Sequence, residues 1–238
     1  MKTGLRRSIM AMILGFLCLG ALAQKMGITA SYGFAAQRMD DLKYLQEYIL
    51  STYPVEGKIT SSFPPFTNVS LNVVKEWYDY LHLGGGYTFA TTGGKSSYSD
   101  YTGSIGTEMD VTSHRLGAFL SYIIVERDRL DLALYGRVDA NLSAVQIESA
   151  VNVLGLINRI FNQYRSISPS GTAGIELMFK FRGFALGMEG SYLVDLPGKL
   201  VHTETKNDLT DPYDRNRTLT TDWTGWRAGI KVRIWMGN

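Results

Sequence analysis

Apolar and polar residues alternate along most of this chain, and the alternation limits what it can fold into. A period of two is typical of β-strands whose two faces meet different surroundings. In one clear case Leu130, Leu132 and Leu134 oppose Asp131 and Tyr135. The alternating segments are 26–34, 68–75, 78–90, 112–126, 130–142, 172–181, 184–195 and 226–234. The pattern therefore predicts an all-β protein with eight strands.

The connections between these segments alternate in length. Short turns are expected near Glu76-Trp77, at Arg127-Asp128 and at Arg182-Gly183. Long connections are expected at 36–66, 93–111, 145–170 and 197–222. Short turns at one rim and long extracellular loops at the other are typical of an antiparallel up-and-down transmembrane β-barrel, with its amino terminus on the periplasmic side. Each segment has about the length required, since a tilted strand crosses a bilayer with about 9–11 residues.

The amino terminus has the pattern of an export signal. Lys2, Arg6 and Arg7 precede an apolar run, and Ala21-Leu22-Ala23 offers small residues for cleavage. An uncleaved anchor is the alternative, but the run is shorter than the ~20 residues of a spanning helix. We therefore expect a signal peptide at 1–23, cleaved between Ala23 and Gln24, and an outer-membrane barrel domain at 24–238.

The orientation of the apolar faces separates two kinds of barrel. A soluble barrel turns its apolar face inward, so an exported soluble barrel that binds a small ligand is one alternative. Large residues on the apolar faces, glycines on the polar faces, and Tyr and Trp near the segment ends favour a membrane barrel with a polar lumen instead. Acidic and basic residues on the polar faces are nearly balanced, so they can pair inside. The predicted lumen network consists of Arg115, Asp131, Arg137, Asp139, Glu176, Lys180, Glu189, Arg227, Lys231 and Arg233.

Two helices are expected in the long loops. In the first, Asp40 caps the helix, Leu42, Leu45 and Ile49 share an apolar face, and Pro54 ends it. The second is expected at 147–161, with an apolar stripe of Val151, Leu154, Ile157 and Ile160. The stripe has three explanations: packing of both helices over the barrel mouth, docking of a partner protein, or contact with lipid.

Catalytic, metal and cofactor sites are not expected. The sequence contains no P-loop, no G-x-S-x-G and no metal-ligand spacing. His82, His114 and His202 lack the His-x-Ser pattern of lipid A deacylase-type barrels, which makes a lipid-modifying enzyme the weaker alternative. The acidic residues of the fourth connection, Asp208, Asp211 and Asp214, lack EF-hand spacing and are expected to be solvated. A net charge of +2 gives no basic face for nucleic acid.

With these features the chain resembles the small eight-stranded outer-membrane β-barrel proteins, represented by the transmembrane domain of OmpA and by OmpX. The resemblance covers the mature chain and lies in the architecture and in the terminal strand. Members often finish on an aromatic residue, whereas this chain ends Ile234-Trp235-Met236-Gly237-Asn238. The resemblance implies a monomeric barrel in outer-membrane lipid, with a side-chain-filled lumen and a structural role or a binding or scaffolding role through its loops, with another envelope protein as a candidate partner.

Overall fold

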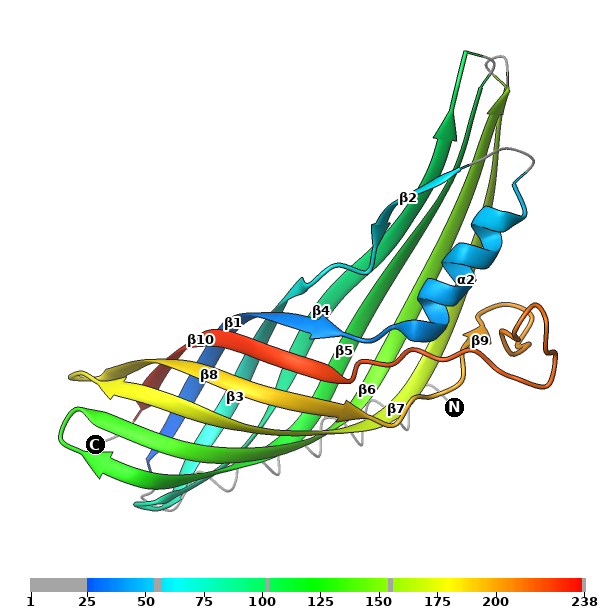
Figure 1. Ribbon diagram of the computed structural model, residues 1–238. Helices are drawn as coiled ribbons and strands as arrows, with labels where there is room; N and C mark the ends of the chain where they lie inside the picture. The colour runs from blue at the N-terminus through cyan, green and yellow to red at the C-terminus, as the bar shows by residue number, and fades with distance from the viewer. Residues whose placement is uncertain (1–24, 54–56, 102, 154–155, 237–238) are drawn as a thin grey trace.

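Eight antiparallel strands close into a ring in the computed structural model, which describes residues 25–53, 57–101, 103–153 and 156–236 (Figure 1). Around the ring each strand pairs with the next, and the last strand pairs back with the first. In ring order the strands are β1 (Met26–Gln37), β3 (Phe66–Tyr78), β4 (Leu81–Ser99), β5 (Gly103–Arg127), β6 (Leu130–Val153), β7 (Leu156–Lys180), β8 (Phe184–Asp195) and β10 (Gly225–Met236). The predicted eight-stranded up-and-down barrel is confirmed. The predicted signal peptide lies outside the described residues.

The outer surface of the ring is apolar and its interior is polar. Leu116, Val138 and Ile167 are 64%, 68% and 70% exposed, whereas Ser113, Asn141 and other polar side chains on the opposite faces are buried. Exposing such a surface to water on every strand is costly, and the hydrocarbon of a bilayer removes that cost. The fold is therefore that of a transmembrane β-barrel. The soluble alternative is wrong because it requires the apolar faces to point inward.

Aromatic side chains gather at both ends of the barrel wall. Tyr80 stacks on Tyr78 and meets Tyr122 edge to face at one rim, and Tyr192 meets Trp226 near the other. Rings with one apolar and one polar part suit the boundary between hydrocarbon and headgroups. No helix in the described part of the chain has the length and apolar character needed to cross a membrane.

Three short turns lie at the rim where Met26 pairs with Met236. The turns at Asp128-Arg129 and Arg182-Gly183 agree with prediction to within one residue. The turn predicted near Glu76-Trp77 is wrong, because β3 continues to Tyr78 through an irregularity in its pairing with β4.

Two of the four predicted long loops are strands. β4, β5, β6 and β7 contain 19, 25, 24 and 25 residues and continue beyond the rim as a curved sheet, here called the sheet extension (residues 91–99, 103–112, 144–153 and 156–165; Figure 1). Two short strands widen the sheet: β2 (Lys58–Ser62) pairs with β4, and β9 (Val201–His202) pairs with β7.

The helix predicted at 147–161 is wrong. Val151 belongs to β6, Ile157 and Ile160 belong to β7, and Leu154 lies outside the described residues. The apolar residues of the stripe are three apart in the sequence, a spacing that also occurs on one face of a helix, and this coincidence led to the wrong prediction. The two-residue alternation continues here, with Val145 and Ile147 buried while Gln146 between them is exposed.

The first predicted helix is confirmed as α2 (Asp40–Ser51), with Leu42 and Leu45 buried and Ile49 packed beside them. Asp40 is not its cap. The N-cap is Met39, in the left-handed conformation at φ 50°, and Asp40 is the first helical residue. Pro54 lies outside the described residues.

A hydrophobic core lies over the lumen and joins α2, the sheet extension and the 197–222 connection. Trp223 is fully buried in it, meets Phe66 edge to face and donates a hydrogen bond from Nε1 to Ser143 Oγ at 2.8 Å. The inward faces of β5 and β6 therefore change from polar within the barrel to apolar above it. This mouth core consists of Ala35, Met39, Leu42, Leu45, Phe63, Phe66, Ala90, Met109, Val111, Val145, Ile147, Leu193, Leu200, Leu219 and Trp223.

Candidate functional site

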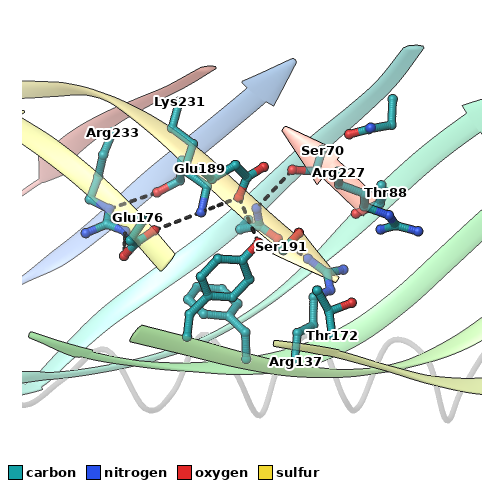
Figure 2. A pocket seen from close by; sticks show the side chains of 15 residues that line it. Ser70, Thr88, Arg137, Thr172, Glu176, Glu189, Ser191, Arg227, Lys231 and Arg233 are labelled. Atoms are coloured by element: carbon teal, nitrogen blue, oxygen red, sulfur yellow. Dashed lines mark hydrogen bonds and ion pairs between the residues drawn. The ribbon is translucent and has the colours of Figure 1, made fainter. Parts of the chain in front are cut away.

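The barrel lumen is the candidate functional site. Fifteen side chains, drawn in Figure 2, line a polar cavity of about 50 Å³, and all eight strands of the ring contribute to the lining. A cavity of this size has room for roughly three or four water molecules. The strand alternation places these side chains inside, because residues two apart in sequence share a face.

Glu176 of β7 is the centre of the largest ionic cluster. One of its oxygens lies 2.8 Å from Lys231 Nζ, and the other lies 3.2 Å from Arg233 Nη2. Ser121 Oγ also donates a hydrogen bond to Glu176, at 2.8 Å. Because Glu176 is only 3% exposed, these donors supply the stabilisation that water would otherwise give.

The cluster extends to Glu189 of β8 and to His82 of β4. Lys231 Nζ lies 2.7 Å from Glu189, and the Tyr135 hydroxyl donates to the same carboxylate at 3.1 Å. Arg233 Nη1 lies 3.4 Å from His82 Nδ1. The structure thus brings together four of the predicted network residues, Glu176, Glu189, Lys231 and Arg233.

Arg137 and Asp139 form a second group on β6. Arg137 donates from Nε to Asp139 at 2.6 Å, from Nη1 to Asn72 at 2.7 Å and from Nη2 to the carbonyl of Gly86 at 3.0 Å. The glycines beside this group leave room for it. A Cβ atom at Gly117 would lie 2.1 Å from the carbonyl oxygen of Val138 and 2.2 Å from Asp139 Oδ1.

The remaining predicted residues lie apart from these groups. Lys180 forms ion pairs at the rim with Asp131 at 2.8 Å and with Glu126 at 3.1 Å. The side chains of Lys180 and Asp131, the two members of the predicted network, are partly exposed there. Arg115 is 1% exposed, and its three guanidinium nitrogens have no hydrogen-bond partner among the described residues. Two nitrogens of Arg227, Nε and Nη2, are also buried and have no hydrogen-bond partner among the described residues. The predicted single network is therefore two groups, one rim pair and two unpaired arginines.

The prediction missed a buried polar group around Asp195, the last residue of β8. Its carboxylate accepts hydrogen bonds from Ser168 Oγ at 2.8 Å, from the Trp223 backbone N–H at 3.3 Å and from Asn141 Nδ2 at 3.5 Å. Asn141 and Asp195 lie on polar faces of two predicted strands, so the alternation could have identified them, whereas Ser168 lies in a part of β7 that was predicted to be a loop.

Another polar cluster fastens the 197–222 connection to α2. Asp211, expected to be solvated, is buried and accepts backbone N–H bonds from Tyr213 at 2.9 Å and Asp214 at 3.3 Å, and the Tyr44 hydroxyl donates to it at 3.2 Å. Arg217 pairs with Asp211 and with Asp41 of α2. The Tyr213 N–H above all, helped by the other donors and by Arg217, lowers the pKa of the Asp211 carboxyl below 3.8.

The histidines lie in separate places. His82 is in the lumen, His114 on the outer surface binds the Tyr87 hydroxyl through Nδ1 at 2.6 Å, and His202 Nδ1 accepts backbone N–H groups of its own turn. Across the described ranges, no group of three His, Cys, Asp or Glu residues is placed to hold a metal ion. The geometry of the lumen supports charge pairing and hydration.

Comparisons with known proteins find similarity in structure only. No family model and no curated protein matches the sequence. Ail, the attachment invasion locus protein of Yersinia pestis, superposes with a TM-score of 0.42 at 15% identity, covering 90% of this chain and 100% of that one. Neisserial surface protein A gives 0.40 at 11% identity, with 88% and 96% covered. A major outer membrane protein from Thermus thermophilus gives 0.47 at 10% identity, with 90% and 100% covered.

Proposed function

We propose that this protein is a monomeric integral β-barrel of the outer membrane, which supports the envelope and presents its sheet extension for binding or scaffolding. The observation that supports this proposal best is the inside-out distribution of side chains, with an apolar outer wall around a polar, ion-paired lumen. A wall of closed β-strands satisfies every backbone group within the sheet, as the hydrocarbon of a membrane requires.

Cell fractionation combined with one substitution tests the membrane location. We expect the protein to sediment with outer membranes and to migrate differently before and after heating on a semi-native gel. Val138→Arg places a charge in the middle of the wall and should lower the free energy of unfolding in lipid by about 2–4 kcal/mol. Val138→Leu is the matched control and should change it little. A protein recovered as a soluble species from detergent-free periplasmic extract would refute the proposal.

The tip of the sheet extension supports the binding role. Leu156, Ile157, Ile160 and Phe161 are all more than half exposed, on a sheet that projects beyond the rim. Leu156 and Ile160 lie on one face of β7 and Ile157 and Phe161 on the other, so the tip exposes apolar side chains on both faces. Exposed apolar side chains that lie close together are typical of contact sites for other proteins. In outer-membrane barrels the short turns are periplasmic and the longer connections are extracellular, which supports an extracellular position for this tip.

Photo-crosslinking from the tip in intact cells tests the binding role. A crosslinker at Ala150 should yield a discrete adduct with another envelope protein. Ile157→Ser combined with Ile160→Ser removes one large apolar side chain from each face of β7 and should abolish the adduct. Asn158→Ser combined with Arg159→Gln changes the two residues between them, again one on each face, and should retain it. Equal adducts from both double variants would exclude an apolar contact at the tip.

We further propose that the protein has no catalytic role. A catalytic histidine is commonly oriented by a carboxylate that binds its ring. In the described structure His114 binds the Tyr87 hydroxyl and His202 binds backbone N–H groups, and neither set of contacts includes a carboxylate, which supports this proposal. Lipid profiles of membranes with and without the protein should be the same. A modified lipid A species that depends on His114 would overturn this proposal.

A further inference from the structure

The lumen holds an excess of positive charge. The inward faces of the described strands carry five basic residues and four carboxylates between two limits. One limit is the ion pairs of Lys180 at the rim with the short turns, and the other is the mouth core. The basic residues are Arg115, Arg137, Arg227, Lys231 and Arg233, and the carboxylates are Asp139, Glu176, Glu189 and Asp195. Asp222 lies three residues before β10 and so is not on the inward face of a ring strand; its carboxylate accepts a hydrogen bond from the Thr224 backbone N–H at 2.9 Å.

The excess falls on Arg227. Arg137, Lys231 and Arg233 have direct carboxylate partners. Arg115 has no direct partner, but it is attracted by two carboxylates, those of Asp139, which pairs with Arg137, and of Asp195. Arg227 forms no ion pair within the described part of the chain, and its Nε and Nη2 are buried. An uncompensated charge in a narrow lumen is strongly destabilising.

Unused hydrogen-bond donors line the same cavity as Arg227. Asn68 Nδ2 and the Thr172 hydroxyl are buried and have no partner among the described residues. Figure 2 shows Arg227 with Ser70 and Thr88 at the end of the cavity away from Glu176. The carboxylates that line the other end already have Lys231 and Arg233 as partners.

We propose that this cavity binds a small monovalent anion of the halide class, held by the guanidinium of Arg227 with the amide of Asn68 and the hydroxyl of Thr172. Water alone can satisfy the free donors, but it leaves the positive charge unbalanced. A volume of about 50 Å³ favours a small ion, and the two carboxylates in the lining disfavour a multivalent one. The inference concerns the lumen only and does not depend on what the sheet extension binds.

Unfolding of the refolded full-length mature barrel in detergent micelles tests the proposal. Urea titrations in sodium chloride and in sodium gluconate, at equal ionic strength, separate a bound halide from general salt screening. At a chloride concentration 100 times the Kd, the folded-to-unfolded ratio should be about 100-fold higher than in gluconate. Arg227→Gln removes the charge and should abolish the difference, while Arg215→Gln, an exposed arginine in the 197–222 connection, should keep it.

Diffraction from bromide-soaked crystals gives a second readout that does not require the variant to fold. We expect an anomalous bromide peak in the lumen beside Arg227 and Thr172. Thr172→Val is the milder variant and should weaken both the peak and the chloride effect. Equal stability of the wild type in chloride and gluconate, retention of the chloride effect by Arg227→Gln, or bromide peaks confined to the outer surface would each overturn the proposal.

Discussion

Lys231 and Glu176 form an ion pair across the lumen, with Nζ 2.8 Å from Oε2, although β8 lies between their strands in the ring. Backbone pairing connects each strand only to its two neighbours. The Lys231–Glu176 pair therefore adds a connection that the sheet itself does not provide. Lys231 completes it by also binding Glu189 on the intervening strand.

Replacing Lys231 with methionine should destabilise the barrel strongly. Glu189 would lose its ion pair and Glu176 would keep only Arg233, and removing one partner of a buried pair typically costs about 3–5 kcal/mol. The free energy of unfolding in lipid or micelles measures the effect. Lys199→Met breaks an exposed pair with Asp208 and should cost at most about 1 kcal/mol. Similar losses in the two variants would show that the lumen pairs add no more than surface pairs.

Two glycine-to-alanine substitutions should have opposite effects on stability. At Gly117 the added Cβ would lie 2.1 Å from the backbone oxygen of Val138, which cannot move without disturbing the sheet, so we expect a loss of about 1–3 kcal/mol. At Gly136 nothing lies within 4 Å of the added atom, so Gly136→Ala should be neutral or stabilise by up to about 1 kcal/mol. Equilibrium urea unfolding of both variants checks this difference, and a harmless Gly117→Ala would contradict the close packing of the lumen wall.

Attachment of the 197–222 connection to α2 should weaken in acid. The folded state lowers the pKa of Asp211, so its contribution is fully present above the ordinary value of 3.8 and is lost as the pH falls through the lower folded value. A nitroxide label at residue 216 should therefore be immobile at pH 5–8 and become mobile only below about pH 4. In Asp211→Asn this transition should disappear. A mobility transition near pH 6 would point to a group other than Asp211.

The sequence was sufficient to predict the barrel because the alternation reports directly on the two environments of each strand. The outward positions of the strands include Leu116, Val138 and Ile167. The inward positions include Glu176, Lys231 and Arg233. Which ions would pair was beyond this method. Pairing depends on the register between strands, and no local pattern indicates that Lys231 reaches β7 past β8.

The sheet extension was missed for a different physical reason. Above the rim, the inward side chains of β5 and β6 become apolar where α2 and the 197–222 connection cover them, as at Val111 and Val145. A search for strands with polar inward positions therefore ends each strand at the point where these side chains become apolar. The contact that reveals it, Trp223 against Phe66, joins parts of the chain that are far apart in sequence.

The pairing of Met26 with Met236 makes the first and last strands of the ring neighbours. Closure of the cylinder therefore has to wait until the carboxy-terminal segment has been delivered. Any shorter nascent or truncated chain would present two open sheet edges and would need protection from aggregation. Insertion is thus expected as a late, all-or-none event that follows synthesis.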